Sequence, residues 1–298
     1  MTDTRATFVF RDIDGHRIYA DVYHADGEGT HPCALFIHGG GLIMGHRRML
    51  PPYLESVRRR GYSIVSIDYR LAPETKLPAI VGDVAAAWSW LRAEASALDI
   101  DRDRVAVVGH SAGGFLTLWS GFGLTPRPAA VVSIAGYGSL ANSEFASPSA
   151  FYSTAVPWVD EAVARSAIGA QPISESGPGD SMQFFTGRGA FYLYCRQNGV
   201  WLREISGHDP NDAAWFEQFE AVRRMTADYP PTLLLHGDAD TDIDVAQAEA
   251  LQSALARHGV PHEFVRRAEW GHAFLYIPND PMATAAFERI GAFLDLHV

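Results

Sequence analysis

Apolar positions along the chain follow two patterns. In short runs, neighbouring residues are apolar and often β-branched, which is typical of buried strands. In longer stretches, apolar residues recur every three or four positions, which is typical of helices that bury one face. The strand-like runs are 33–37, 63–69, 104–108, 129–135, 232–235 and 262–266. Because helical stretches separate most of these runs, the pattern predicts a parallel sheet with right-handed crossovers.

The first two runs of the chain follow a different order. Residues 8–11 and 16–23 flank the sequence Asp12-Ile13-Asp14-Gly15. An Asp-Gly pair supplies the positive φ angles that a tight turn needs. We therefore predict an antiparallel hairpin at the start of the sheet.

The alternation of strands and helices lapses between 137 and 229. Helical spacing survives only in two short stretches, 159–167 and 215–222, and aromatic residues are mildly enriched between Phe145 and Phe219. We predict an α/β core formed by residues 1–136 and 230–298, with a largely helical cap inserted at 137–229. The alternative is a set of ordinary packing helices with no role in ligand binding.

Composition narrows the class of protein. The chain has 298 residues, 47% of them hydrophobic, which fits a soluble protein with one large core and an insertion. Its net charge of -11 argues against nucleic acid or an anionic membrane as the main partner. The sequence shows neither a basic and apolar leader nor a run of about 18 apolar residues, so we expect a cytoplasmic protein. Its oligomeric state stays open, with a homodimer among the options.

The strand-like run 104–108 leads into Gly109-His110-Ser111-Ala112-Gly113 and then into a helical stretch. A serine between two such glycines, on a sharp turn from strand to helix, is the nucleophile elbow that raises a hydroxyl above a sheet edge. Glycine is needed on both sides because a Cβ would crowd the neighbouring strand or helix. We therefore predict that Ser111 is a nucleophile, and the alternative is a simple glycine-rich turn.

A serine hydroxyl needs a base beside it and a third group that orients the base. Asp240 follows the run 232–235, and His272 follows the last run, so both should reach the sheet edge where Ser111 emerges. Asp240 is favoured as the acid and Asp242 is the alternative, while Asp244 is expected to cap the next helix. Three other histidines could act as bases but are expected to be structural or peripheral: His38, His46 and His208.

Three glycines follow His38 at the end of the run 33–37. Consecutive glycines expose backbone amides that form a nest for an anion. Such a nest would suit the oxyanion that forms when a serine attacks a carbonyl. This chemistry needs neither a metal nor an organic cofactor, and the two cysteines, Cys33 and Cys195, have no metal-ligand spacing.

Five segments occur in a specific order. They are 38–41 (HGGG), 68–74 (DYRLAPE), 109–114 (GHSAGG), 236–240 (HGDAD) and 271–274 (GHAF). In this order they resemble the hormone-sensitive-lipase-like carboxylesterase branch of the α/β-hydrolases, from about residue 33 to the C-terminus apart from the insertion. The resemblance implies an α/β-hydrolase fold and a catalytic triad of Ser111, Asp240 and His272. It also implies an oxyanion hole formed by the amides of Gly40, Gly41 and Ala112.

These features together predict a serine hydrolase that cleaves small-molecule carboxylic esters of small or medium acids. An arylformamidase, another amide hydrolase or a lactonase could use the same triad, because the pocket decides the leaving group. A non-catalytic ligand-binding protein of the same fold is the alternative from another class. We expect five side chains to contact the substrate: Leu42, Phe184, Phe185, Trp215 and Phe274.

Overall fold

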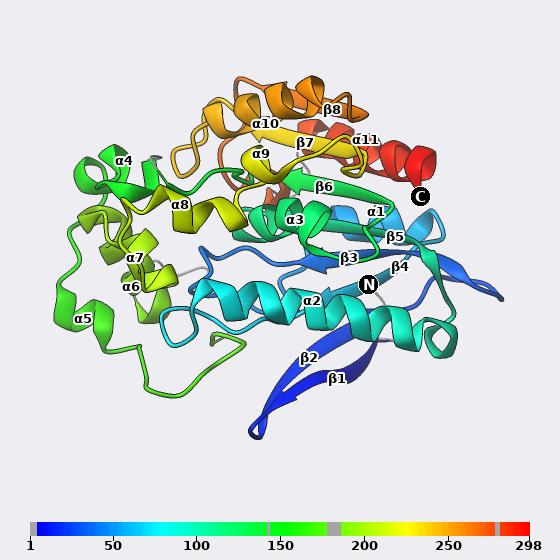
Figure 1. The fold of residues 1–298 in the computed structure, drawn as a ribbon, viewed down its shortest axis with the longest axis horizontal. Coiled ribbons are helices and arrows are strands. Elements are labelled where there is room, and N and C mark those ends of the chain that lie inside the picture. The colour runs from blue at the N-terminus through cyan, green and yellow to red at the C-terminus, as the bar shows by residue number, and fades with distance from the viewer. Residues whose placement is uncertain (1–4, 142–143, 178–185, 278–280) are drawn as a thin grey trace.

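The computed structural model describes residues 5–141, 144–177, 186–277 and 281–298, and Figure 1 shows its arrangement. One eight-stranded sheet runs through the molecule in the order β1-β2-β4-β3-β5-β6-β7-β8. The strands are β1 (Arg5–Ile13), β2 (His16–Tyr23), β3 (His31–Ile37), β4 (Ser63–Ile67), β5 (Ile100–His110), β6 (Ala130–Ile134), β7 (Thr232–Gly237) and β8 (His262–Arg267).

The pairing of the strands confirms the predicted sheet. Strands β1 and β2 form the antiparallel hairpin, with positive φ angles at Asp14 and Gly15 in its turn. Strand β2 then pairs antiparallel with β4, and every further pair is parallel. Strand β5, which leads to Ser111, lies between β3 and β6 in the centre of the sheet.

Helices cover both faces of the sheet. Their bounds in the core are α1 (Tyr53–Arg59), α2 (Leu77–Glu94), α3 (Ala112–Gly123), α10 (Ala246–Arg257) and α11 (Pro281–His297), with the short 3₁₀ helices η1 (Ala95–Leu98) and η4 (Phe274–Tyr276). Helices α1 and α11 pack on one face, and α2, α3 and α10 pack on the other (Figure 1).

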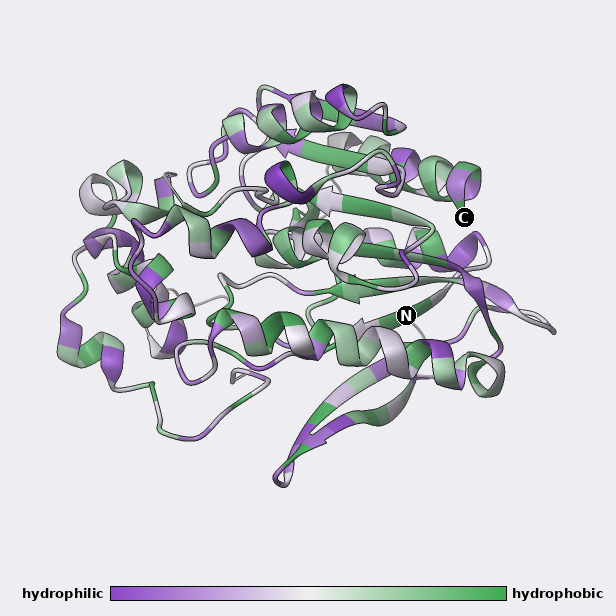
Figure 2. Ribbon diagram, in the orientation of Figure 1, coloured by the Kyte–Doolittle hydropathy of each residue, from purple (hydrophilic) through white to green (hydrophobic). Residues whose placement is uncertain are grey.

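Alternating residues of β3 show how both faces become buried. Leu35 and Ile37 point into the cluster under α2 and α3, whereas Ala34 and Phe36 point into the cluster under α1 and α11. A strand covered on both sides is apolar along its whole length, as expected for a parallel sheet. Figure 2 shows the central strands as largely hydrophobic and the outer hairpin as mixed.

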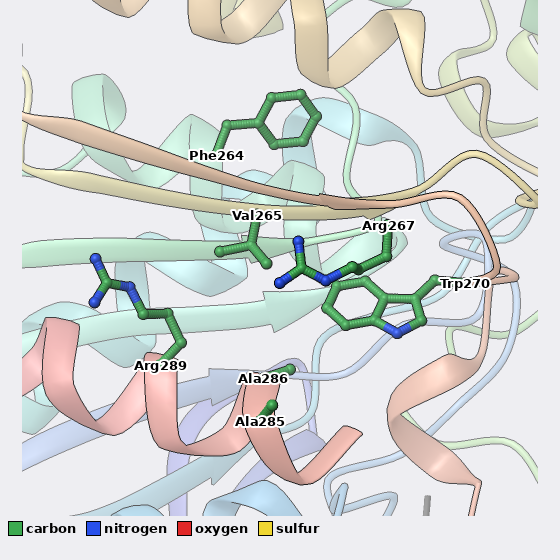
Figure 3. Close-up of a pocket in the computed structure, with 7 residues that line it drawn as sticks. All are labelled: Phe264, Val265, Arg267, Trp270, Ala285, Ala286 and Arg289. Carbon is green, nitrogen blue, oxygen red and sulfur yellow. The ribbon is translucent and has the colours of Figure 1, made fainter. Parts of the chain in front are cut away.

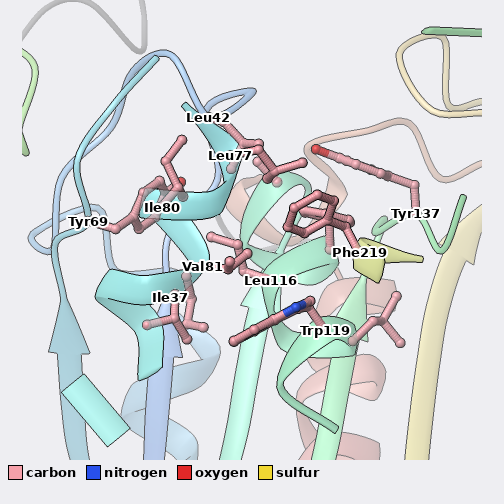
Figure 4. Close-up of a cluster of buried hydrophobic side chains, with 14 of the residues drawn as sticks. Ile37, Leu42, Tyr69, Leu77, Ile80, Val81, Leu116, Trp119, Tyr137 and Phe219 are labelled. Carbon is pink, nitrogen blue, oxygen red and sulfur yellow. The ribbon is translucent and has the colours of Figure 1, made fainter. Parts of the chain in front are cut away.

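The larger cluster continues from the sheet into the inserted segment. Figure 4 shows Ile37 of β3 with Leu116 and Trp119 of α3, and beside them Tyr137 and Phe219. Tyr137 stacks on the ring of Phe115, with 4.9 Å between the ring centroids. One apolar core therefore supports both the sheet and the segment that follows β6.

Every regular element described between β6 and β7 is helical. These elements are η2 (Glu144–Ala146), α4 (Ala150–Thr154), α5 (Glu161–Arg165), α6 (Gly187–Asn198), α7 (Trp201–Ser206), α8 (Ala213–Phe216), η3 (Glu217–Phe219) and α9 (Ala221–Arg224). Helices α4 to α8 lie beyond the carboxyl ends of β6 and β7 (Figure 1). In the described ranges, no helix has both the length and the apolar content that crossing a membrane requires.

The structure breaks the helical stretch predicted over 215–222 into α8, η3 and α9. Glu220 has extended backbone angles, φ -94 and ψ 110. From there its buried carboxylate accepts hydrogen bonds from the amides of Leu140 and Ala141, at 2.8 and 2.9 Å. A continuous helix would aim this side chain elsewhere, so the tertiary contact overrides the local periodicity.

Gly113 sets how closely α3 approaches β3. A Cβ at this position would lie 2.0 Å from the carbonyl oxygen of Ile37. We expect Gly113→Ala to lower the free energy of unfolding by about 1–3 kcal/mol, because backbone must move to relieve the overlap. Thermal unfolding measures the change. The matched control is Gly82→Ala in α2, where the nearest atom is 3.7 Å away; it should stabilise by about 0.5–1 kcal/mol. Equal effects of both substitutions would contradict this account of the packing.

Candidate active site

Ser111 stands on the turn between β5 and α3. Its backbone angles are φ 56 and ψ -122, a conformation that a side chain rarely adopts. Its amide donates to the carbonyl of Ile134, at 2.8 Å. A Cβ at Gly109 would lie 2.2 Å from the carbonyl oxygen of Gly113, so the turn closes only with glycine there. The chain thus has the strand, turn and helix of a nucleophile elbow.

The structure brings Ser111, His272 and Asp240 together from three separate loops. His272 follows β8, and its Nε2 lies 2.9 Å from Ser111 Oγ. Asp240 follows β7, and its Oδ2 lies 2.8 Å from His272 Nδ1. Because a carboxylate oxygen only accepts, Nδ1 carries a proton and donates, which leaves Nε2 as the acceptor for the serine hydroxyl.

Asp240 is held as a carboxylate by several donors. Its Oδ1 accepts hydrogen bonds from the amides of Asp242 and Ile243, at 2.9 and 3.0 Å. Its Oδ2 also lies 3.2 Å from His236 Nε2. Burial acts to raise the pKa of Asp240, but hydrogen bonds with His236 and His272 outweigh it and hold the pKa well below its usual range. The group facing His272 is therefore an anion.

The surroundings make His272 a stronger base than an ordinary histidine. Burial acts to lower its pKa, but the hydrogen bond with Asp240 and the charges of Asp242 and Asp240 together raise it above the usual 6.5. The effect of Asp242 follows from its position, because its Oδ2 lies 3.6 Å from His272 Nε2. This is the same nitrogen that faces Ser111.

His110 positions the loop that carries His272. The two rings lie 5.0 Å apart, and His110 Nε2 donates to the backbone carbonyl of His272 at 2.8 Å. Burial lowers the pKa of His110 to about 3, so its ring stays neutral. The residue next to the nucleophile therefore fixes the backbone of the residue that would act as base.

The glycine loop after β3 borders the same site. Gly40 and Gly41 have φ angles of 106 and 61, and with Ser111 they line one cavity. A Cβ at Gly41 would lie 2.4 Å from the ring of Tyr192. Ala112 is fully buried as the first residue of α3. Gly40 and Gly41 therefore border the same cavity as Ser111, and Ala112 follows Ser111 directly in the chain.

Two side chains of the inserted segment hold the glycine loop from behind. Trp201 Nε1 donates to the carbonyl of Gly41 at 2.9 Å. Arg188 is buried and donates to the carbonyls of Ile43 and Ala72 while its guanidinium pairs with Glu74 at 2.9 Å. A buried carbonyl group is costly without a hydrogen-bond donor, so these contacts fix the path of the loop.

The other candidate bases are engaged elsewhere. His38 is fully buried and stacks on Tyr69, and burial lowers its pKa to about 3. His46 Nδ1 accepts from the amide of Arg48 at 3.1 Å. His208 stacks on Trp215 with 3.8 Å between centroids.

The cavity above Ser111 has a volume of about 310 Å³. Its described lining residues are Gly39, Gly40, Gly41, Met44, Met49, His110, Ser111, Tyr192, Asp242, His272, Ala273 and Tyr276. Most of these contribute apolar or uncharged surface. The cavity therefore suits a small, mostly apolar ligand with a few fixed polar contacts.

The structure does not bring the expected substrate-contacting side chains into this lining. Leu42 is fully buried in the core, where its φ of 61 turns the chain after the glycines. Phe274 stacks on Trp270 at 4.0 Å in the cluster on the opposite face of the sheet. Trp215 packs on His208 instead. The predictions for Phe184 and Phe185 fall outside the described residues.

Sequence reasoning missed several lining residues. Tyr276 and Ala273 are close to His272 in sequence, and Met44 and Met49 follow the glycine loop, so proximity to named motifs could have suggested them. Tyr192 gave no such signal. It comes from α6, whose apolar residues 190–195 form one continuous run, so the sequence shows no helical spacing there.

A second cavity of about 310 Å³ lies between β8 and α11, away from the proposed nucleophile. Figure 3 shows its lining, which is Phe264, Val265, Arg267, Trp270, Ala285, Ala286 and Arg289. None of these residues belongs to the Ser111 site. In the part of the chain that the structure covers, no group of three His, Cys, Asp or Glu side chains is placed to hold a metal ion.

Comparison with known proteins adds a family match. A family model described as the α/β-hydrolase fold matches residues 34–276. Non-reducing polyketide synthase ausA of Aspergillus calidoustus is 31% identical over 298 residues, which cover 83% of this chain. This chain spans only 12% of the length of that relative.

Two solved structures share the fold across almost the whole chain. A protein of unknown function from Staphylococcus aureus subsp. aureus Mu50 has a TM-score of 0.81 and 22% identity, covering 98% of this chain and 99% of its own. A thermophilic esterase from Thermogutta terrifontis, solved with propionate, has a TM-score of 0.71 and 18% identity, covering 99% and 94%. At such identities these likenesses establish the shared fold.

The basicity of His272 predicts a pH dependence for Ser111. A serine is activated only while its base is neutral, so reactivity should fall as the pH falls through the pKa of His272. Because that pKa is raised, the midpoint should lie above 6.5. The rate at which a neutral fluorophosphonate labels Ser111, measured against pH, tests this. A midpoint at or below 6.5 would contradict the proposed electrostatics.

The hydrogen bond from Trp201 to Gly41 predicts a role for α7 in reactivity. Trp201→Phe removes the indole N–H and leaves the carbonyl of Gly41 without this donor. We expect the labelling rate of Ser111 to fall roughly two- to tenfold, the equivalent of one net hydrogen bond. Trp215→Phe is the matched control and should leave the rate unchanged. Equal rates in both variants would show that this bond does not shape the site.

Proposed function

We propose that this protein is a serine esterase acting on small-molecule carboxylic esters of small or medium acids. The chain belongs to the α/β-hydrolase family, which supports a hydrolase. The resemblance to the hormone-sensitive-lipase-like branch is confirmed by the family match. The observation that supports the activity is the hydrogen-bonded chain from Asp240 through His272 to Ser111, at 2.8 and 2.9 Å. These hydrogen bonds end at Ser111, which lines the cavity.

Acylation would begin with attack of Ser111 Oγ on the ester carbonyl carbon. The hydroxyl proton passes to His272 Nε2, while Asp240 stabilises the imidazolium that forms. His272 then gives this proton to the oxygen of the leaving alcohol, and the acyl group stays on Ser111. A water molecule then attacks the carbonyl carbon of the acyl-enzyme and gives its proton to His272. His272 returns the proton to Ser111 Oγ as the acid is released.

The oxyanion would be stabilised by the backbone amides of Gly40, Gly41 and Ala112. Gly40 and Gly41 border the cavity, and Ala112 follows the nucleophile at the start of α3. One such donor contributes roughly a hundred- to a thousandfold to turnover in related chemistry. The contacts of Trp201 and Arg188 behind the loop support this role, because they fix the loop before the substrate binds.

The size of the cavity supports a modest substrate. Its volume of about 310 Å³ is near the lower end of ligand pockets. The Thermogutta terrifontis esterase, which shares the fold, was solved with propionate bound. Formamides, other amides and lactones would be attacked by the same nucleophile. Only measured turnover of each class distinguishes them from esters as substrates.

Ser111→Ala and His272→Ala test the proposal together. Each should lower kcat for a neutral short-chain ester by several orders of magnitude, and the double variant should be little worse than either single one, because the two groups act as a unit. Turnover of acetyl and butyryl esters, with circular dichroism to check folding, measures this. Folded single variants that retain normal turnover would disprove the assignment.

The non-catalytic alternative is tested on the same variants. A fluorophosphonate should label the wild-type protein at Ser111 and fail to label Ser111→Ala. A wild-type protein that binds short-chain esters but is neither labelled nor turns them over would favour a ligand-binding protein.

A further inference from the structure

Asp242 is a carboxylate within the cavity that would hold the substrate. Among the described lining residues of the Ser111 cavity it is the one acidic side chain, and no lysine or arginine lines it. The mechanism proposed above gives this residue no contact with the substrate. A charge retained in a mostly apolar pocket usually marks a polar contact that orients a ligand.

The inserted segment fixes the orientation of this carboxylate. The hydroxyl of Tyr192, on α6, lies 2.6 and 2.7 Å from its two oxygens. Burial, followed by the charge of Asp242, raises the pKa of Tyr192, so this hydroxyl stays protonated and donates. The Asp242 side chain therefore cannot swing freely out of the cavity.

Arg196 approaches Asp242 from another side. Its Nη2 donates to the backbone carbonyl of Asp242 at 2.9 Å, and its Nη1 lies 3.5 Å from Oδ1. Arg196 and Asp242 also line a separate cavity of about 450 Å³, to which Ser111 does not contribute. Arg196 therefore faces Oδ1 and offsets part of the charge, whereas Oδ2 is the oxygen that lies 3.6 Å from His272 Nε2.

The position of Asp242 identifies the part of the substrate that it would meet. Asp242 Oδ2 lies 3.6 Å from His272 Nε2, and Ser111 Oγ lies 2.9 Å from the same nitrogen. In an ester hydrolase this nitrogen must reach the oxygen of the leaving alcohol in order to protonate it. The first atoms of the alcohol beyond that oxygen therefore lie beside Asp242, whereas the acyl group lies on the other side of the carbonyl.

We propose that Asp242 determines specificity for the alcohol part of the ester. It favours alcohols that carry a positive charge or a hydroxyl near the ester oxygen, and it disfavours alcohols that carry a negative charge. This inference rests on the proposed esterase function. It narrows the substrate class from short-chain esters to esters of amino alcohols or polyols.

Three acetyl esters test the proposal because their acyl group is the same. They are the ester of choline, the ester of its neutral isostere with carbon in place of the ammonium nitrogen, and the ester of glycolate, which is anionic. In the wild-type protein kcat/KM should decrease in that order. Asp242→Asn should reduce the ratio of cationic to neutral ester by roughly tenfold and raise the ratio of anionic to neutral ester by a similar factor.

Asp244→Asn is the matched control. It removes the same charge two residues away, from an exposed side chain whose Oδ1 accepts from the amide of Ala246 at 2.9 Å. Asp244 does not line the Ser111 cavity. Because exposed charges are screened, its ratios should stay within about twofold of the wild type. Equal shifts in both variants would assign the preference to the general field of the loop and overturn the proposal.

The ratios of kcat/KM between the three esters distinguish this role from two others that Asp242 could have. If it only supports α6, or only raises the basicity of His272, its replacement changes all three esters by the same factor. The comparison is made above the pKa of His272, where the base is neutral in every variant. An unchanged cationic-to-neutral ratio in Asp242→Asn would overturn the proposal.

Tyr192→Phe keeps the proposal testable if Asp242→Asn does not fold. This variant retains the carboxylate and removes the hydroxyl that orients it. It should weaken the preference for the choline ester, since the carboxylate is no longer held in the cavity, and an unchanged preference would contradict the proposal. If the wild-type protein hydrolyses all three esters equally well, this inference fails and the esterase function stands. If none is hydrolysed and Ser111 is not labelled, both fail.

Discussion

The close approach of α3 to the centre of the sheet is the constraint on which the site depends. A Cβ at Gly109 would lie 2.2 Å from the carbonyl oxygen of Gly113, and a Cβ at Gly113 would lie 2.0 Å from the carbonyl oxygen of Ile37 in β3. Only this approach leaves Ser111 at a φ of 56 at the end of the central strand. Such a backbone conformation costs about 1–3 kcal/mol and persists because its surroundings leave no alternative. The loops that carry Asp240 and His272 then need only reach the edge where β5 ends.

Helix α6 links three parts of the site that are distant in sequence. Arg188 donates to carbonyls after β3 and after β4, and Arg196 donates to the carbonyl of Asp242 after β7. A buried guanidinium is costly unless it is fully paired, so these contacts are weak evidence for added stability. Helix α6 therefore contacts both the segment after the glycines and the loop that carries the acid.

The sequence predicted the sheet and the elbow because these depend on local patterns. Strand runs, the Asp14-Gly15 turn and the glycines around Ser111 each have a physical reason that a few neighbouring residues express. The lining of the pocket could not be predicted in this way. Leu42 and Phe274 are apolar and close to the motifs, yet both are buried in the two cores, since apolar side chains fill a core before they line a cavity. Helix α6 gave no signal because its apolar residues 190–195 are consecutive, and a short continuous apolar run does not distinguish a helix from a strand.

The acid loop shows how one spacing gives similar residues different environments. Four carboxylates lie at every second position from 238 to 244, a pattern that is typical of a solvated turn. In the structure, Asp238 pairs with Arg266 at the surface, and Asp244 accepts a hydrogen bond from the amide of Ala246, the first residue of α10. Asp240 turns inward to His272 Nδ1, and Asp242 turns inward to Tyr192.

Because the loop bends after β7, two of the four carboxylates face the imidazole of His272 from opposite sides. Asp240 approaches the nitrogen that holds the proton, and Asp242 approaches the nitrogen that exchanges it. The repulsion between two buried anions is offset by the separate donors that each one receives. A protein that needed only a triad could place an apolar residue at 242 and avoid this cost.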